Sequence, residues 1–386
     1  MGIWIGRGRK ARQTYGFDDV ALVPGKFTID PDDVDVKWTI REHVFDIPII
    51  ASAMDGVVDV KFAIEMGKLG GLAVLNLEGL QTKYEHPEEH LQRIVDAPKE
   101  TVTKILQDIY KEPIKENLIV KCIEDIKKAG VKASVSSTPL NAERFGQIAK
   151  EAGVDIFVIQ STVTTVKHIS SQYKSLNFKQ FCKQMDMPVI VGNSVSYEAS
   201  LEMMETGIDA ILIGVGPGAA CTTREVLGIG VPQITATADA AAARDTYYKH
   251  TGNYVSVITD GGMRGGGDFC KAIASGADAV MIGSAFAKSD EAPGKGYHWG
   301  MATPSILLPR GTRIQVGIHG TLKEILLGPA RYDDGSQNLV GALRNSMGSC
   351  GAQNIREMQV CDMIVAPSIR TEGKTLQRAQ SVGMGK

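Results

Sequence analysis

A glycine-rich segment near the middle of the chain holds the side chains best suited to chemistry. It reads GVGPGAACTTR from Gly214 to Arg224 and places Cys221 two positions before Thr223. Glycine has no Cβ, so such a turn lets the backbone approach a ligand or an ion closely. Cysteine attacks as a thiolate, a form that Arg224 and nearby backbone N–H groups would favour. We therefore predict that Cys221 is a nucleophile; the alternative is a loop cysteine without a role.

The other thiols and the histidines give no comparable signal. The six cysteines contain no Cys-x-x-Cys pair of the kind found in zinc and redox sites, and most are predicted to be buried thiols. His86 and His90 lie four residues apart, but within a charged segment. That context is typical of a solvated helix face rather than of a metal site.

Eight short apolar runs must position these side chains. They are continuous rather than alternating, as expected of parallel strands that are buried on both faces. Amphipathic segments of helical length lie between most of them, and several of these end at a glycine. The pattern predicts one closed (β/α)8 TIM barrel, with an open doubly wound sheet as the alternative. The runs are Pro48–Met54, Gly71–Leu77, Val131–Ser136, Asp155–Ser161, Pro188–Asn193, Asp209–Gly214, Tyr254–Asp260 and Asp278–Gly283.

The ends of the last two runs predict a phosphate site. Active sites of these barrels lie at the carboxyl ends of the strands, and phosphate is commonly bound after strands seven and eight. Here those strands end in Asp260-Gly-Gly262 and Gly283-Ser284. The glycines would expose backbone N–H groups, and Asp260 could accept a hydrogen bond from a sugar hydroxyl. Glycines that only make tight turns are the alternative.

Polar residues also end the fourth and fifth runs. Gln160 and Ser161 follow the fourth, and Asn193 ends the fifth. We expect them either to contact a cofactor or to satisfy the loop backbone, and the sequence does not separate these alternatives.

The barrel is predicted to form a single catalytic domain over residues 15–367. A charged insertion after the second strand, residues 78–130, carries extra helices near 88–95 and 101–110. Residues 1–14 form a polar N-terminal arm and residues 368–386 a polar tail, both expected to be mobile.

Composition excludes several other classes of protein. The chain has 386 residues and a formal net charge of −2, without the basic footprint of a nucleic-acid partner. No apolar stretch approaches the ~20 residues of a membrane span, and no signal-peptide pattern occurs. We expect a cytoplasmic protein that binds neither nucleic acid nor membrane.

Several segments together resemble the IMP dehydrogenase/GMP reductase family. The resemblance extends from about Tyr15 to about Met358, and the Gly214–Arg224 segment is its most specific part. The insertion at residues 78–130 is too short for the paired regulatory (CBS) module that many IMP dehydrogenases carry after the second strand, and the chain resembles the IMP-dehydrogenase-related branch of the family. The other matching segments are FDDVALVP (17–24), PIIASAMD (48–55), GIGVPQ (228–233), DGG (260–262), GS (283–284) and EAPG (291–294).

The resemblance implies a role for each site residue. Cys221 would attack C2 of the purine of GMP or IMP, and Thr223 would assist proton transfer. A nicotinamide cofactor would contact Gln160, Ser161, Asn193, Gly214 and Gly216. A monovalent cation, often potassium, would bind backbone carbonyls of Gly216, Gly218 and Cys221. The family also implies a homo-oligomer, a tetramer or an octamer. The substrate would contact Ser52, Asp260, Gly261, Gly262, Gly283, Ser284, Gly300, Met301 and Arg310.

The chain departs from the family pattern at several positions. Ala219 replaces the serine that usually binds phosphate, and Gln160 replaces an aspartate that contacts the cofactor. Arg310 stands where the family usually has a glutamate. The flap with its Arg-Tyr pair should follow Met301, yet Arg331-Tyr332 lies too far along the chain to occupy that place.

These departures bear on the direction of the reaction. A dehydrogenase must hydrolyse the purine–cysteine intermediate and uses the flap arginine as the base for water. A reductase needs no water, so the missing flap favours NADPH-dependent GMP reductase. IMP dehydrogenase, which uses NAD, is the first alternative. A flavin oxidoreductase and a catalytically silent nucleotide-binding regulator are the others.

Overall fold

Eight parallel strands close a barrel in the computed structural model, which describes residues 2–300, 313–380 and 382. Each strand pairs with the next along the chain, and the last pairs with the first, which confirms the predicted (β/α)8 fold. All eight predicted runs supply a strand. The strands are β6 (Ile49–Ala51), β7 (Leu72–Asn76), β8 (Ser134–Ser137), β9 (Ile156–Gln160), β10 (Val189–Ser194), β11 (Ala210–Ile213), β12 (Ser256–Asp260) and β13 (Ala279–Ile282).

The strands are apolar throughout because both of their faces are buried. In β10, Ile190 points into the barrel, whereas Val189 and Val191 pack in the layer between strands and helices. A hairpin of β4 (Trp38–Ile40) and β5 (His43–Phe45) adds Trp38 to the interior cluster. The Trp38 indole N–H donates to Ser256 Oγ (3.3 Å) at the start of β12, so this hairpin closes the amino-terminal end of the barrel.

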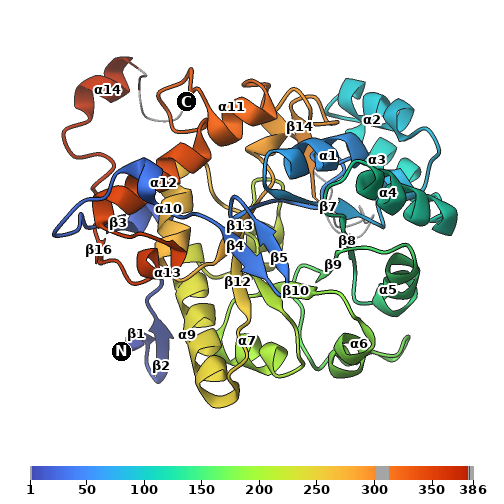
Figure 1. The fold of residues 1–386 in the computed structure, drawn as a ribbon, viewed down its shortest axis with the longest axis horizontal. Coiled ribbons are helices and arrows are strands. Elements are labelled where there is room, and N and C mark those ends of the chain that lie inside the picture. The colour runs from blue at the N-terminus through green and yellow to red at the C-terminus, as the bar shows by residue number, and fades with distance from the viewer. Residues whose placement is uncertain (1, 301–312, 381, 383–386) are drawn as a thin grey trace.

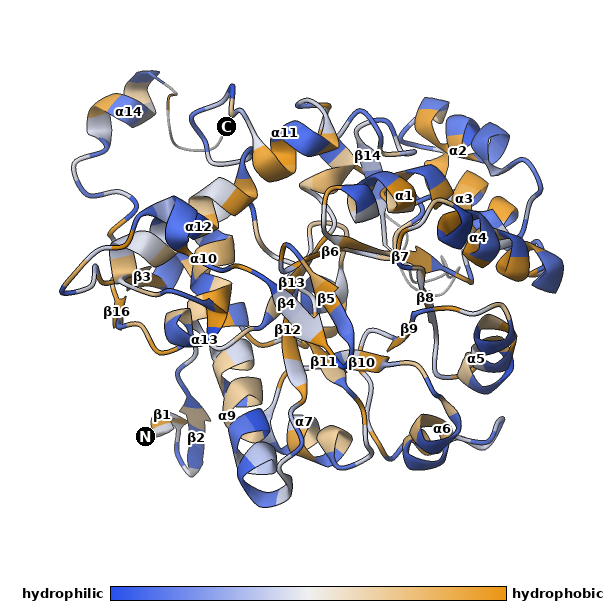
Figure 2. Ribbon diagram, viewed as in Figure 1, coloured by the Kyte–Doolittle hydropathy of each residue, from blue (hydrophilic) through white to orange (hydrophobic). Residues whose placement is uncertain are grey.

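Helices surround the barrel and present their polar sides outward (Figure 2). Five glycines that were predicted to end helices all have positive φ, from +76° to +109°, a conformation that glycine adopts readily. These are Gly70, Gly130, Gly153, Gly207 and Gly276. The ring includes α1 (Val60–Lys68), α4 (Glu116–Lys128), α5 (Ala142–Glu151), α6 (Phe178–Gln184), α7 (Tyr197–Met204), α9 (Gln233–Thr251), α10 (Gly266–Ala274) and α12 (Leu339–Cys350).

The long connection after β7 contains two extra helices, α2 (Pro87–Asp96) and α3 (Val102–Tyr110). They pack on each other around a small apolar core of their own, at the upper right of Figure 1. The next helix, α4, packs against α1 and α5, so it belongs to the ring around the barrel. The insertion proper is therefore the α2–α3 pair, which we call the insertion helices.

The described segments nearest the two termini lie outside the barrel (Figure 1). β1 (Gly2–Gly6) and β2 (Arg9–Arg12) form an exposed hairpin, and the tail carries α14 (Thr375–Gln380). Short antiparallel pairs join β3 (Val20–Leu22) to β16 (Met363–Val365), and β14 (Tyr297–Trp299) to β15 (Arg313–Gln315). The remaining helices are α8 (Thr223–Leu227), α11 (Leu322–Leu327) and α13 (Ile355–Met358).

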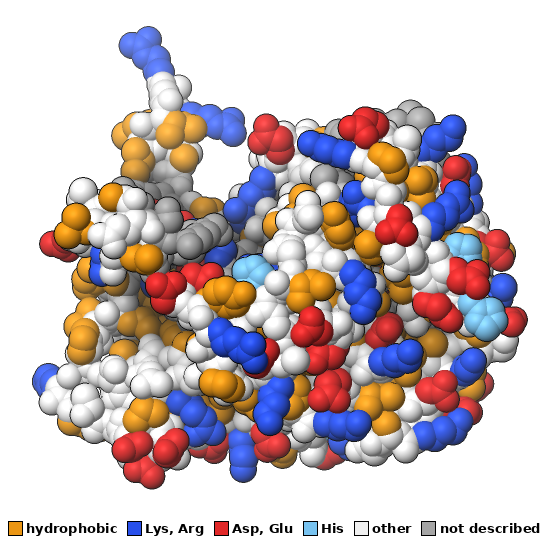
Figure 3. Space-filling view, turned by 90° about the horizontal axis from the view of Figure 1, so that it is seen from above, with side chains coloured by type: hydrophobic (Ala, Val, Ile, Leu, Met, Phe, Trp, Pro, Cys, Tyr) orange, Lys and Arg blue, Asp and Glu red, His pale blue; other side chains and the backbone are white. Residues whose placement is uncertain are grey.

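The surface in Figure 3 carries interspersed acidic and basic side chains. Within the described residues, no helix combines the length and the apolar character needed to cross a membrane.

Candidate active site

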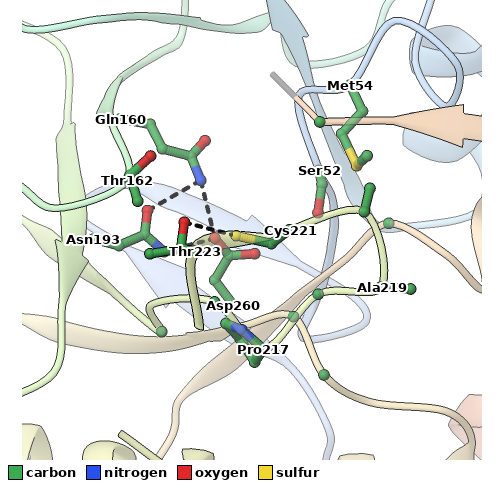
Figure 4. Close-up of a pocket in the computed structure, with 18 of the residues that line it drawn as sticks. Ser52, Met54, Gln160, Thr162, Asn193, Pro217, Ala219, Cys221, Thr223 and Asp260 are labelled. Carbon is green, nitrogen blue, oxygen red and sulfur yellow. Dashed lines mark hydrogen bonds between the residues drawn. The ribbon is translucent and has the colours of Figure 1, made fainter. Parts of the chain in front are cut away.

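A cavity of about 400 Å³ opens where the barrel strands end. Its lining includes every described residue that the sequence predicted for the site, and these residues come from the ends of six barrel strands and from the segment after β14 (Figure 4). Met301 and Arg310 lie outside the described residues. The predicted residues in the lining are Ser52, Gln160, Ser161, Asn193, Gly214, Gly216, Gly218, Cys221, Thr223, Asp260, Gly261, Gly262, Gly283, Ser284 and Gly300.

Cys221 lies in the loop between β11 and α8, and it is exposed in this cavity. Its thiol donates to the Thr223 hydroxyl at an Sγ–Oγ1 distance of 3.2 Å, and its backbone N–H donates to Gly218 O (3.0 Å). Thr223 is the first residue of α8 and is buried, which fixes its hydroxyl beside the thiol. The pair has the geometry of a nucleophile with a hydroxyl in reach that can relay a proton.

Arg224 holds the base of this loop. Its Nε donates to Val215 O (3.2 Å) and its Nη2 to Val231 O (2.8 Å). Burial lowers the pKa of Arg224, and the charge of Cys221 partly offsets that effect. The guanidinium therefore braces the loop and also lies within electrostatic range of the thiol, as the sequence predicted.

The other cysteines are poor nucleophiles. Burial raises the pKa of Cys122, Cys182 and Cys270 to about 12 and that of Cys361 to about 11. Thiols with such values stay protonated at neutral pH.

Asp260, at the end of β12, is the centre of a hydrogen-bonded group. Its Oδ2 accepts from Asn193 Nδ2 (2.7 Å) and from Gln160 Nε2 (2.9 Å). Burial raises its pKa to about 6, although both hydrogen bonds lower it, so the group is mostly ionised at neutral pH. Its second oxygen has no partner among the described residues and is free to accept from a ligand hydroxyl.

We expect Asp260→Asn to stabilise the fold and to weaken ligand binding. The folded-state pKa lies above the ordinary 3.8, so the carboxylate lowers stability above pH 6, and this cost disappears as the pH falls towards 3.8. Asparagine should raise the free energy of unfolding at pH 8 by about 1–2 kcal/mol, a figure reduced for the partial exposure of the group. Urea unfolding at pH 8 and pH 4 tests this, and an equal gain at both values would contradict it.

Backbone groups line the side of the cavity where the sequence predicts a phosphate site. Gly261 and Gly262 have φ of +79° and +83°, and a Cβ on Gly283 would lie 2.8 Å from Met54 Sδ. Among the described residues, the N–H groups of Gly262 and Ser284 have no hydrogen-bond partner. These positions fit the predicted phosphate site, whose occupant remains a prediction.

The lining residues that were not predicted include Met54, Glu78 and His298. Glu78 follows β7, and its Oε1 accepts from Thr138 N (2.6 Å). The rule that active-site residues follow barrel strands would have identified it. His298 lies beside Ser284, with Nε2 and Oγ 3.0 Å apart, and burial lowers its pKa to about 4. His298 is therefore neutral at pH 7. Its position two residues before the predicted site residue Gly300 could have identified it from the sequence.

The described part of the lining contains four side chains that can ionise, namely Glu78, Cys221, Asp260 and His298. This part of the lining contains neither lysine nor arginine. No group of three or more His, Cys, Asp or Glu residues that could hold a metal ion occurs among the described residues.

Fold and site together define a (β/α)8-barrel protein with a cysteine-bearing cavity at the carboxyl ends of its strands. The model of the IMP dehydrogenase/GMP reductase domain matches residues 14–369. The chain belongs to this family of oxidoreductases.

Individual relatives agree with this assignment. An uncharacterized oxidoreductase of Mycolicibacterium smegmatis is 40% identical over 94% of this chain and 99% of its own length. Inosine-5′-monophosphate dehydrogenase of Borreliella burgdorferi is 31% identical over 90% of this chain and 93% of its own. The crystal structure of an IMP dehydrogenase/GMP reductase-like protein from Corynebacterium glutamicum superposes with a TM-score of 0.90 at 35% identity, over 95% of this chain and 98% of that one.

Proposed function

We propose that the protein oxidises or reduces C2 of a purine 5′-nucleotide through a covalent adduct on Cys221, and that it works as an IMP dehydrogenase. The observation that carries the proposal is the exposed Cys221 thiol, 3.2 Å from the Thr223 hydroxyl, at the mouth of the barrel. The phosphate would bind the N–H groups of Gly262 and Ser284, and the ribose would bind Asp260.

In the dehydrogenase direction, the Cys221 sulfur adds to C2 of IMP, and the hydrogen on C2 leaves as hydride. The nucleotide is then held as a thioimidate. Water adds to C2, loses a proton and expels the thiolate, which gives XMP. Thr223 Oγ1 accepts the hydrogen bond of the thiol and would relay its proton, receiving the thiol proton as its own hydroxyl proton passes to water in the cavity.

The side of the cavity that Gln160 lines fits a nicotinamide. Gln160 Oε1 is buried and has no partner among the described residues, so it can accept from a carboxamide N–H. Ser161, Thr162 and Asn193 line the cavity beside it. When bound there, a nicotinamide accepts or supplies the hydride at C2. NAD is the cofactor of the proposed dehydrogenase, and NADPH that of the alternative reductase.

Two observations favour the dehydrogenase. The Borreliella relative bears that name and aligns over most of both chains. In addition, Arg310 replaces the glutamate with which the reductases support the threonine in donating a proton to ammonia. An arginine, with a pKa above ~12, is a poor proton donor. Arg310 therefore lacks the property by which the glutamate supports the threonine, and this disfavours release of ammonia.

GMP reductase remains the second candidate, because only a few residues separate Met301 from Leu308, where the family flap should lie. In that reaction the thiolate displaces ammonia from C2 of GMP with uptake of a proton. Hydride then adds to C2, and the thiolate leaves from IMP.

A single experiment separates the two directions. Purified protein is incubated with IMP and NAD, and separately with GMP and NADPH, while the absorbance of the reduced nicotinamide is followed. The proposal predicts that absorbance rises in the first mixture and stays constant in the second. A fall in the second mixture alone would show a reductase, and no change in either would contradict the proposed function.

A position in the catalytic loop, two residues before Cys221, offers a gain-of-binding test. Ala219 is exposed in the cavity and lacks the hydroxyl that the family uses for phosphate. We expect Ala219→Ser to add one hydrogen bond, worth about 0.5–1.5 kcal/mol, and so to tighten IMP binding several-fold in calorimetry. Unchanged or weaker affinity would mean that another group already fills this role.

The monovalent cation at Gly216, Gly218 and Cys221, and assembly into a tetramer or an octamer, stay predictions drawn from the family. The carbonyl of Gly218 already accepts one hydrogen bond, from Cys221 N, and keeps a second lone pair for a cation. Activity measured with potassium against a large organic cation, and the mass of the assembly in solution, test these two points.

A further inference from the structure

The insertion helices share their core with the active-site segment. The apolar cluster between α2 and α3 includes Trp299 of β14, which is buried. Trp299 lies between His298 and Gly300, and both of these line the cavity. The insertion therefore contacts the segment that carries these two cavity-lining residues.

Tyr110, the last residue of α3, joins two parts of the site. Its hydroxyl accepts from Trp299 Nε1 (2.8 Å) and donates to Asp55 Oδ2. Burial and the Asp55 charge raise the pKa of Tyr110 well above its ordinary value, so the phenol keeps its proton. Burial raises the pKa of Asp55 to about 6, so this carboxylate is mostly ionised at neutral pH and accepts the bond.

Asp55 in turn is packed between two loops that line the cavity. It follows Met54 in the chain, and its Oδ2 accepts from Leu80 N (3.0 Å). A Cβ on Gly79 would lie 2.0 Å from Asp55 Oδ1, so the carboxylate occupies the space that a side chain there would need. Glu78 of the same loop lines the cavity.

Arg313 provides a second, independent connection. It lies opposite Trp299 in the β14–β15 pair. Its guanidinium donates to Val95 O and Ala97 O (2.8 Å each), and also to Ile94 O, at the carboxyl end of α2. A cation at the carboxyl end of a helix is favourable for the unpaired carbonyls there. Both strands of this pair are thus held by the insertion.

We propose that the insertion helices are a positioning element of the active site, in which Tyr110 fixes Asp55 and Trp299 and so sets the places of Met54, His298 and Gly300. The proposal rests on the proposed function for its effect on turnover. Small displacements of groups around a reacting atom cost large factors in rate while leaving binding nearly intact.

Tyr110→Phe tests this inference, with Tyr84→Phe as the matched control. Each variant loses one phenol hydroxyl next to α3, since Tyr84 OH donates to Ile109 O (2.8 Å). Of these two tyrosines, only Tyr110 forms hydrogen bonds with Asp55 and Trp299. We expect Tyr110→Phe to lower kcat about tenfold or more with nucleotide affinity within about twofold, and Tyr84→Phe to leave both nearly unchanged. Hydrogen exchange should become faster at residues 297–300 and 313–315 in Tyr110→Phe alone.

Three outcomes would overturn the inference: unchanged kcat in Tyr110→Phe, unchanged exchange at these residues, or equal effects of the two variants. Equal effects would mean that the insertion supports only general stability. If the unaltered protein turns over neither nucleotide, the proposed function fails. Hydrogen exchange in Tyr110→Phe, measured without any substrate, then decides whether the insertion holds the β14–β15 pair.

Discussion

Cys221→Ala should abolish turnover and leave nucleotide binding almost intact. C2 of a purine exchanges hydride readily only after the cysteine has added to it, so loss of the sulfur removes the reaction path itself. We expect kcat to fall by at least about 10³-fold, as the loss of a covalent nucleophile usually costs. The proposed phosphate and ribose contacts lie on other loops, around Gly262, Ser284 and Asp260, so calorimetry with IMP should give a similar affinity.

Cys361→Ala is the matched control for this variant. Cys361 is partly exposed but does not line the cavity, and burial raises its pKa to about 11. The Cys361→Ala variant should retain full activity. Cys270→Ala serves as a buried control, whose loss of activity should not exceed its loss of folded protein. More than a few per cent of the original turnover in Cys221→Ala would contradict the covalent mechanism.

Thr223→Val should produce the second largest loss. Valine keeps the volume of the buried side chain but removes the oxygen that lies 3.2 Å from the thiol. General acid–base groups contribute about 10²–10⁴-fold, so we expect kcat to fall within that range with little change in affinity. The measurement is the steady-state rate with saturating substrates, together with its pH profile.

Thr223→Ser distinguishes proton transfer from packing. Serine restores the hydroxyl and loses only a methyl group, so it should recover most of the activity lost in the valine variant. Serine and valine variants with equal activity would show that Thr223 acts through packing rather than through its oxygen.

The fold was predictable because each barrel strand carries its own signal. In β10, residues that face inward and outward are equally apolar, so a continuous run such as PVIVGN identifies a parallel strand without knowledge of its neighbours. Much of the cavity followed from one geometric rule, that loops after parallel strands meet at one end of a barrel. That rule placed Gln160, Asn193 and Asp260 together, and they form one hydrogen-bonded group.

What could not be predicted depends on contacts between distant parts of the chain. Tyr110 and Trp299 are 189 residues apart, and neither lies in a pattern that local periodicity can read. The same holds for Arg313 at the end of α2, 216 residues from Ala97. His298 was missed for a different reason: it lies on a strand outside the barrel, where the strand-end rule does not apply.

The most direct test of the covalent mechanism is to isolate the adduct. Protein in steady-state turnover is quenched with acid and digested, and the peptide that contains Cys221 is weighed by mass spectrometry. Dehydrogenase and reductase pass through the same thioimidate, so in either direction we expect the mass of this peptide plus that of IMP less two hydrogen atoms, which equals the addition of GMP with loss of ammonia. This mass should be absent from Cys221→Ala. Turnover without that adduct, or the same adduct on another cysteine, would contradict the account.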